Sequence, residues 1–289
     1  MIKRILCLTL CLCMALALLP GSVQADSKIY LALGDSISTG FGLKDAKTEG
    51  YTYMLADQLG YELTNCAIDG NTTAGLIQQM AKPEIQAKIA RADLITITVG
   101  GNDMMGLFYS AVGDIFSTLS GGATQLTLSD IYAILGNPTD TRMTMLMMCA
   151  QMVLMGNPTA GTPAFMESET FAAGLTAYAT ALTGITTAIH MLNPDAKIVV
   201  ATQYNPFAGF TGMYAALNNG FEMGVQKLNE AIRTNAEAGG YIVADVYDAF
   251  ANSENYLYNA TMDPLFFDTH PNAAGHKVIQ ETFFSALGN

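Results

Sequence analysis

The sequence is poor in basic residues. Its 289 residues include 13 Lys and Arg against 25 Asp and Glu, which gives a formal net charge of −12. No basic stretch breaks this balance, whereas surfaces that bind nucleic acid or anionic lipid are clusters of Lys and Arg. The composition therefore argues against nucleic acid and anionic membrane surfaces as partners, and we attribute the acidity to solubility.

Motifs for nucleotides and metals are also missing. The chain has no Gly-x-Gly-x-x-Gly turn, no P-loop and no Gly-x-Ser-x-Gly elbow, and it contains three histidines. A structural zinc site needs about four Cys or His ligands at characteristic spacings, and the chain has no cysteine pair at such a spacing. We therefore expect neither a bound nucleotide nor a structural zinc ion.

The first 25 residues have the composition of a targeting segment. Two basic residues precede an apolar run at 5–19, and small residues end the segment at Ala25. A run of about 15 apolar residues is shorter than the roughly 20 that span a bilayer, so an uncleaved anchor is the weaker alternative. We expect a signal peptide cleaved near Ala25, a mature chain of 26–289 that is secreted or extracytoplasmic, and no stable membrane span after processing.

Only two cysteines lie in the expected mature chain, Cys66 and Cys149. An oxidising location permits one disulfide between them. Both cysteines also lie in apolar segments, where inert core thiols are equally common. The sequence leaves both alternatives open.

Short apolar runs alternate with longer helical patterns along the mature chain. This alternation is typical of a parallel sheet covered by helices on both faces, in a three-layer α/β/α sandwich. No linker or repeat divides the chain, so we expect one domain. The expected strands are 29–33, 63–68, 94–99, 198–202 and 241–246, and the helical patterns include 51–59, 73–90, 171–192 and 221–238.

A long segment at about 104–170 separates the third and fourth expected strands. It exceeds what one crossover helix needs, so we expect a helical insertion. Two interpretations of its crowded methionines stay open: a hairpin in which they fill a core, or a lid or adaptable apolar pocket for an acyl chain. These methionines are Met143, Met145, Met147, Met148, Met152 and Met155.

Polar, glycine-rich turns follow the first three expected strands. They lie at 34–38, 69–71 and 100–103. The carboxyl ends of parallel strands meet at one edge of a sheet, so these turns are expected to lie together. The first turn carries Ser36, and Asp268-Thr269-His270 lies near the far end of the chain. A serine becomes a strong nucleophile when an imidazole takes its proton and a carboxylate orients that imidazole. The residues therefore predict a serine hydrolase.

These motifs together resemble the conserved blocks of GDSL/SGNH esterases and lipases, the SGNH hydrolase superfamily. They occur in the family's order and span nearly the whole mature chain. The resemblance implies a flavodoxin-like sandwich with a five-stranded parallel sheet and no metal or organic cofactor. The matching residues are Gly34, Asp35, Ser36, Ile37, Ser38, Gly40, Gly42, Asn65, Gly70, Gly100, Gly101, Asn102, Asp103, His270, Pro271, Asn272, Gly275 and His276.

The resemblance also implies a role for each central residue. Ser36 is the expected nucleophile, and His270 is the expected general base and then general acid. The backbone N–H groups of Ser36 and Gly70 and the side-chain amide of Asn102 are the expected oxyanion hole. Such donors stabilise the tetrahedral oxyanion because they are in place before the charge develops.

The acid behind His270 departs from the family's pattern. The family usually has its aspartate three residues before the histidine, where this chain has Phe267. Asp268 lies two residues before, and residues at i and i+2 of an extended segment face the same side. We therefore expect Asp268 to orient His270, with Asp263 or a backbone carbonyl as the alternatives.

Four other polar residues are expected to have structural roles. Asp35 is expected to hydrogen-bond its own turn, and Asp103 to cap the helix that opens the insertion. His276 is expected to pack behind the site. His190 is expected to lie at the end of a helix, where a cation suits the helix dipole.

The expected activity is hydrolysis of carboxylic esters through an acyl-enzyme on Ser36. Lipid acyl and short-chain acyl esters are the expected substrates. A carbohydrate O-acetyl esterase and an acyltransferase, in which a sugar hydroxyl replaces water, need the same residues and stay open. A secreted binding module on a hydrolase fold is the non-enzymatic alternative, but it predicts loss of Ser36, Asn102 or His270, and all three are present. The sequence leaves the oligomeric state open.

Overall fold

A computed structural model of the chain describes residues 27–122, 125–137, 139–157, 159, 161–263 and 265–288. The expected signal peptide and its cleavage position lie outside these residues.

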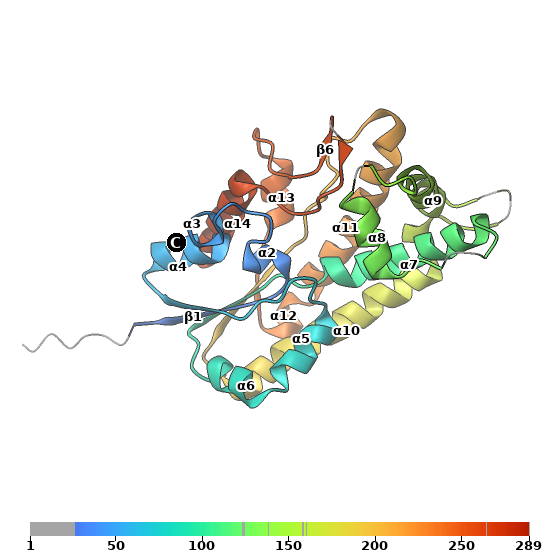
Figure 1. Ribbon diagram of the computed structural model, residues 1–289. Helices are drawn as coiled ribbons and strands as arrows, with labels where there is room; N and C mark the ends of the chain where they lie inside the picture. The colour runs from blue at the N-terminus through green and yellow to red at the C-terminus, as the bar shows by residue number, and fades with distance from the viewer. Residues whose placement is uncertain are drawn as a thin grey trace, which may run out of the picture.

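A five-stranded parallel sheet forms the centre of the molecule (Figure 1). Its strand order, β2-β1-β3-β4-β5, is that of flavodoxin-like folds, so the expected fold class is confirmed. All five strands run in the same direction, but the chain adds β2 on one side of β1 and the later strands on the other side. The switch point therefore lies between β1 and β3, and such a point opens a crevice at the carboxyl ends of the strands. The strands are β1 (Ile29–Leu33), β2 (Glu62–Asn65), β3 (Leu94–Ile97), β4 (Lys197–Ala201) and β5 (Ile242–Ala244).

Alternate residues of β1 enter two different cores. Leu31 and Leu33 pack with side chains from α5, α6, α10 and α11, whereas Tyr30 and Ala32 pack with side chains from α4, α13 and α14. This follows from the period of two along a strand. Figure 1 shows the resulting layers, with one helix group on each face of the sheet. These helices are α4 (Tyr51–Leu59), α5 (Thr73–Met80), α6 (Pro83–Ile89), α10 (Glu169–Leu192), α11 (Ala215–Thr234), α13 (Val246–Ala251) and α14 (Ala273–Ala286).

Several element boundaries differ from the sequence-based expectation, and two of the differences have a clear cause in a single residue. The helix expected at 73–90 is divided into α5 and α6, because Pro83 lacks the N–H of a continuing helix and instead occupies the first turn of α6. β2 ends at Asn65 instead of residue 68. The Asn65 Oδ1 accepts a hydrogen bond from the Ala67 N–H at 3.0 Å, a turn-like contact that ends the regular strand, although the Cys66 and Ile68 N–H groups still donate to the carbonyls of Ala32 and Gly34.

The helix α11 also begins six residues before the expected helix at 221–238. It ends at Thr234, and the short α12 (Ala236–Gly239) follows it. Among the described residues, α10 is the one helix that is long and apolar enough to span a membrane by length and composition. Its Tyr178, Leu182 and Ile185 are buried in the core that also contains Leu31 and Leu33 of β1.

The insertion between β3 and β4 supplies most of a separate hydrophobic core, which residues such as Phe171 of α10 and Phe221 of α11 complete. It contains α7 (Gly101–Leu119), α8 (Leu128–Leu135), α9 (Met143–Met155) and the 3-10 helix η2 (Phe165–Glu167), and is therefore larger than a hairpin. Met143, Met145 and Met147 pack against this core. The remaining methionines of the crowded segment, Met148, Met152 and Met155, are exposed.

Cys66 and Cys149 are both free thiols. Cys66 packs against the core beneath the sheet, whereas Cys149 is buried within the core of the insertion. Burial raises the pKa of the Cys149 thiol. Of the two alternatives, the structure therefore has core thiols and no disulfide between them.

Candidate active site

Ser36 lies at the first residue of α2 (Ser36–Thr39), directly after β1. The turn depends on Gly34, whose φ is +146° and where an added Cβ would lie 2.3 Å from the Thr98 Oγ1. Asp35 caps α2 by accepting hydrogen bonds from the Ile37 N–H at 3.0 Å and the Thr98 hydroxyl at 2.9 Å. Asp35 therefore organises the turn, as expected from the sequence.

Burial raises the pKa of Asp35 to about 7. The hydrogen bonds from Ile37 and Thr98 and the nearby His270 act in the opposite direction, but they only partly offset the loss of water. A carboxyl with this pKa changes its charge close to neutral pH, next to the serine.

His270 joins Ser36 to Asp268. The His270 Nε2 lies 2.9 Å from the Ser36 Oγ, and the His270 Nδ1 lies 2.5 Å from the Asp268 Oδ1. The structure thus brings together the three residues that the sequence analysis selected, from two ends of the chain. Both ring nitrogens have the partners that an imidazole needs to accept a proton from a serine.

Asp268 contacts both the ring and the backbone of His270. Its Oδ1 also accepts a hydrogen bond from the His270 backbone N–H at 3.0 Å, which is the arrangement of an Asx turn. Burial raises the pKa of Asp268, but the hydrogen bonds from the side chain and backbone of His270 outweigh it and hold the pKa below its usual range. The carboxylate is therefore ionised at neutral pH.

The alternative acid, Asp263, lies in an exposed turn between β6 (Thr261–Met262) and β7 (Leu265–Phe266). Within the described residues, no ion pair joins Asp263 to a histidine. The geometry therefore favours Asp268. The His270 ring also contacts the Phe41 ring, with the ring centroids 4.7 Å apart.

The three expected oxyanion donors line the same cavity as His270. Gly70 has a φ of +72°, a left-handed conformation that glycine adopts without strain. Asn102 lies in the first turn of α7, and its side-chain amide donates a hydrogen bond to the Asn71 carbonyl at 3.1 Å. Because an amide carries two N–H groups, this bond ties the two donor turns together and leaves a second N–H for another acceptor.

Asp103 does not cap α7, and that prediction is wrong. Its carboxylate accepts hydrogen bonds from the Thr73 hydroxyl at 2.5 Å and the Thr73 N–H at 3.1 Å. Asp103 is the third residue of α7, a position from which a side chain can cap its own helix, but here it reaches the start of α5 instead. The Asp103 carboxylate therefore ties the start of α7 to the start of α5, next to the turns that carry Gly70 and Asn102.

The other two histidines have structural contacts. His276 is fully buried in α14, and its Nδ1 accepts a hydrogen bond from the Tyr51 N–H at 3.3 Å. Burial lowers the pKa of His276 to about 4, with a smaller contribution from His270, so it is neutral at physiological pH. At the end of α10, the His190 Nε2 lies 3.0 Å from the Gly240 carbonyl. His276 therefore packs behind the site, as expected.

A cavity of about 620 Å³ extends from the serine into the insertion. Its polar end is formed by Ser36, Gly70, Asn102 and His270. Apolar side chains from several elements line the rest of the cavity, including Met166 of η2, Phe171 of α10 and Phe221 of α11. The apolar residues of α7 and α8 form the part that we call the apolar wall. The wall residues are Met104, Met105, Phe108, Tyr109, Leu128, Tyr132 and Leu135.

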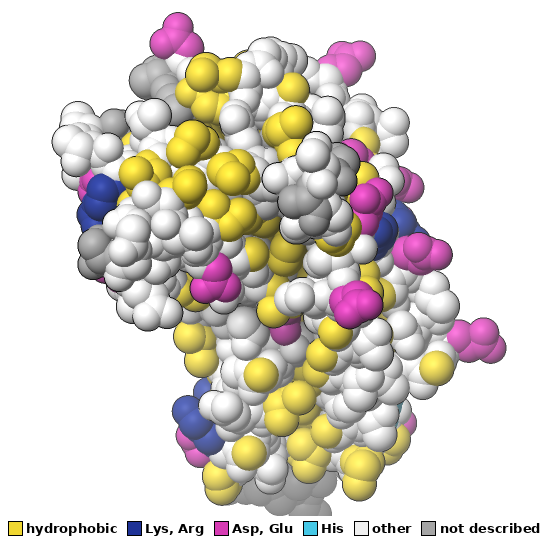
Figure 2. Space-filling view, turned by 90° about the vertical axis from the view of Figure 1, so that its right-hand side faces the viewer, with side chains coloured by type: hydrophobic (Ala, Val, Ile, Leu, Met, Phe, Trp, Pro, Cys, Tyr) yellow, Lys and Arg dark blue, Asp and Glu magenta, His cyan; other side chains and the backbone are white. Residues whose placement is uncertain are grey.

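The sequence did not predict this wall, because the methionines of α9 are the most conspicuous apolar residues of the insertion. None of those six methionines lines the cavity. The signal that could have revealed the wall is the spacing of Leu128, Tyr132 and Leu135, which places three apolar side chains on one face of a helix. Figure 2 views the molecule from the side where α8 and α9 lie in Figure 1, and shows many hydrophobic and few basic side chains on that face.

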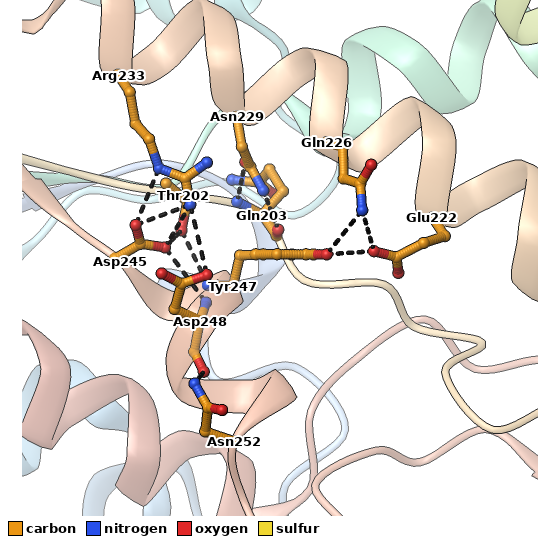
Figure 3. Close-up of polar contacts among 10 residues, drawn as sticks. All are labelled: Thr202, Gln203, Glu222, Gln226, Asn229, Arg233, Asp245, Tyr247, Asp248 and Asn252. Carbon is orange, nitrogen blue, oxygen red and sulfur yellow. Dashed lines mark hydrogen bonds and ion pairs between the residues drawn. The ribbon is translucent and has the colours of Figure 1, made fainter.

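A second polar cluster holds the segment after β4 against α11 (Figure 3). The Asn229 side chain accepts a hydrogen bond from the Gln203 N–H and donates one to the Gln203 carbonyl, both at 2.7 Å. Arg233 forms an ion pair with Asp245 at 2.7 Å, which caps α13. Since Gln203 lines the cavity, the cluster fixes one of its walls. Within the described part of the chain, no group of three or more His, Cys, Asp or Glu side chains could hold a metal ion.

Comparisons with known proteins agree with this geometry. The family model for the GDSL-like lipase/acylhydrolase family matches residues 32–278. The chain is 36% identical to esterase TesA of Pseudomonas aeruginosa over 96 residues, which are 32% of this chain and 44% of that one. It is 33% identical to lipase 2 of Streptomyces coelicolor over 86 residues, which are 26% of this chain and 29% of that one. These matches span less than half of either relative.

Among solved structures, the chain is similar to phospholipase A1 from Streptomyces albidoflavus NA297. The TM-score is 0.56 at 19% identity, over 91% of this chain and 98% of the other. At this identity the similarity shows a shared fold.

Proposed function

Because the chain belongs to the GDSL-like lipase/acylhydrolase family, we propose that it hydrolyses carboxylic esters through a covalent acyl-enzyme on Ser36. The observation that carries the proposal is the contact of the His270 Nε2 with the Ser36 Oγ at 2.9 Å, behind which the His270 Nδ1 faces an ionised Asp268. This is the arrangement that turns a serine into a nucleophile.

In the first half of the reaction, the Ser36 Oγ attacks the ester carbonyl and His270 takes the hydroxyl proton on its Nε2. The ionised Asp268 keeps the ring's other proton on the Nδ1 and stabilises the imidazolium. The Ser36 and Gly70 N–H groups and the Asn102 amide act as donors to the oxyanion. The tetrahedral intermediate then expels the alcohol, which takes the proton from His270, and the acyl group stays on Ser36.

In the second half, His270 takes a proton from water, which attacks the acyl-enzyme. Collapse of the second tetrahedral intermediate returns the proton to the Ser36 Oγ and releases the carboxylic acid. A sugar hydroxyl in place of water gives an acyltransferase with the same residues. Product analysis with and without a sugar acceptor separates the two reactions.

The apolar wall supports a lipid or other extended acyl ester as substrate. Met105, Tyr132 and Leu135 line the same cavity as Ser36. Binding sites for small molecules commonly have volumes of about 300–1,000 Å³ and mostly apolar walls with a few polar groups. An acetyl group on a carbohydrate leaves this wall uncovered, so the wall favours acyl chains over O-acetyl groups.

Export is part of the proposal. The basic start, apolar run and small residues of 1–25 support a signal peptide, and hence an enzyme that acts outside the cytoplasm. The non-enzymatic alternative, a binding module, needs an incomplete site, whereas here Ser36, His270 and Asp268 are in contact.

The test is a series of p-nitrophenyl esters from acetyl to palmitoyl, with purified mature protein. We expect turnover to rise from acetyl to chains that reach the apolar wall. Acid quenching in the presence of a slow substrate, followed by peptide mass spectrometry, is expected to show the acyl mass on the Ser36 peptide. Turnover of no ester, or an acyl group on a different residue, contradicts the proposal.

A further inference from the structure

The Asp268-Thr269-His270 segment is held by side chains outside the catalytic triad. Asp268 and His270 are separated by one residue, and this spacing is shorter than the usual spacing of the family. A short turn alone places the carboxylate against the imidazole but leaves one carboxylate oxygen and the carbonyl of Thr269 to find other partners. Both have partners in this structure.

Asn259 contacts the segment at both of its ends. Its side-chain amide donates a hydrogen bond to the Asp268 Oδ2 at 3.2 Å, and its backbone N–H donates one to the His270 carbonyl at 3.0 Å. The other carboxylate oxygen, Oδ1, already accepts from the backbone and ring of His270. Both oxygens of Asp268 are therefore engaged, which leaves the carboxylate little freedom to rotate.

Tyr204 holds the middle of the segment. Its hydroxyl donates a hydrogen bond to the Thr269 carbonyl at 2.8 Å. The ring is buried and stacks on Phe250, with the centroids 4.5 Å apart. Burial holds the pKa of Tyr204 well above its usual range, so the hydroxyl keeps its proton and remains a donor.

Asn259 is itself fixed by the backbone around it. A bridge pairs Tyr258 with Pro271, and the Asn272 N–H donates a hydrogen bond to the Leu257 carbonyl at 3.0 Å. Gly42 lies beside the amide, since a Cβ built there would be in ordinary contact with the Asn259 Nδ2 at 3.4 Å and the Asp268 Oδ2 at 3.8 Å. The amide is thus presented to the carboxylate by a rigid segment.

We infer that Asn259 and Tyr204 are positioning residues, which hold the short Asp268–His270 turn so that the imidazole faces Ser36. This inference rests on the proposed function. The chemistry predicts a specific signature: loss of either residue lowers kcat with little change in KM, because the ester itself still binds. A role in packing alone predicts a loss of stability without that signature.

The test uses three variants and one matched control. In Asn259→Ala, we expect kcat to fall by roughly tenfold to a hundredfold, which is the scale for misplacing a reacting group by about 1 Å. In Tyr204→Phe, which removes only the hydroxyl, we expect a fall of a few fold. The control is Asn193→Ala, which removes an amide that donates to the Ile89 and Ala92 carbonyls, remote from the triad.

Asn259→Asp separates positioning from packing, because it keeps the shape and removes the donor. It places a second carboxylate beside Asp268, and this added negative charge stabilises the protonated imidazolium of His270. We therefore expect the acidic limb of the kcat/KM profile to move to higher pH. Asp35 and His276, the other titratable groups near His270, are unchanged in every variant.

A readout without turnover keeps the inference apart from the proposed function. The proton shared by the His270 Nδ1 and Asp268 is expected to give a far-downfield NMR signal in the wild type and in Asn193→Ala. In Asn259→Ala the signal is expected to broaden or move. If all variants keep the wild-type signal, kcat and pH profile, the inference is wrong even where esters are hydrolysed. If the signal changes but no ester is turned over by the wild type, the positioning holds and the proposed function fails.

Discussion

The two sides of the cavity are built on different principles. On the polar side, Ser36, Gly70, Asn102 and His270 come from four separate parts of the chain and meet at the carboxyl ends of the strands. On the apolar side, the wall comes from the continuous stretch of α7 and α8. Proton transfer needs atoms held about 3 Å apart, whereas an acyl chain needs only an apolar surface of suitable shape. The polar side therefore depends on the whole fold, whereas the apolar wall depends on one insertion.

The two sides also differ in how firmly their side chains are held in place. The turn that carries Ser36 is held by the hydrogen bond that the Ile37 N–H donates to Asp35, and His270 is held by its contact with the accepting carboxylate of Asp268. Tyr132 contributes to the wall from a helix of eight residues and is itself half exposed. Changes on the polar side are thus expected to abolish turnover, and changes on the apolar side to redistribute it among substrates.

The largest expected effect is that of Ser36→Ala. Removing the nucleophile is expected to lower kcat/KM for a short p-nitrophenyl ester by about 10⁴-fold or more, because no acyl-enzyme can form. Ser285→Ala, at an exposed position of α14, is the control and is expected to keep wild-type activity. Full activity of Ser36→Ala contradicts the assignment of the nucleophile.

The next effect concerns the acid. Asp268→Asn keeps the size of the side chain but cannot stabilise the imidazolium, so kcat is expected to fall by about 10³–10⁴-fold. Asp263→Asn, five residues earlier in an exposed turn, is expected to stay within about twofold of the wild type. Both are compared at equal folding by circular dichroism. If Asp263→Asn lowers kcat and Asp268→Asn does not, the assignment to Asp268 is wrong.

A smaller and selective effect is expected on the apolar wall. Leu135→Trp fills part of the cavity, so kcat/KM for long acyl chains is expected to fall about tenfold relative to acetyl, while acetyl turnover is retained. The matched control is Met155→Trp, a similar enlargement at a residue of α9 that is 66% exposed and lies outside the cavity. A chain-length profile measures both. Equal profiles for the two variants show that α8 does not select the acyl chain.

The smallest effect concerns stability behind the polar side. Burial lowers the pKa of His276 to about 4, from 6.5 in an unfolded chain, so the unfolded state binds more protons between these values. The contribution of His276 to the free energy of unfolding is therefore present above pH 6.5 and is lost as the pH falls toward 4, with a loss of about 2 kcal/mol at pH 5.

His276→Gln keeps an acceptor for the Tyr51 N–H and cannot titrate. We expect its free energy of unfolding, from urea titrations, to depend less on pH between 8 and 5 than that of the wild type. An unchanged slope shows that His276 does not stay neutral in the folded state.

Local patterns in the sequence were sufficient for the sheet and for most of the polar side. Buried apolar runs predicted all five strands, because a strand covered on both faces has to be apolar along its length. The helix boundaries at Pro83 and the end of β2 at Asn65 were missed, since each depends on a single residue that ends an otherwise continuous pattern.

Contacts between distant residues were beyond the reach of such patterns. Asp103 was expected to cap its own helix and instead accepts hydrogen bonds from Thr73 of α5. An apolar pocket was expected from the methionines of α9, but the apolar wall comes from α7 and α8. In both cases the residue type indicated a role, but the partner was set by how helices pack. Asn259 had no local signal at all, because its partner Asp268 lies across a bridge that only the folded chain forms.

The amino-acid sequence by itself determined the kind of chemistry, since Ser36, Asn102 and His270 stand in turns that a parallel sheet collects at one edge. Tertiary structure decided that Asp268 contacts His270, that α7 and α8 line the cavity and that Cys66 and Cys149 stay apart. The physical reason is range. Strand and turn formation depends on neighbours in sequence, whereas a hydrogen bond of 2.5 Å or a cavity wall depends on the relative placement of whole elements.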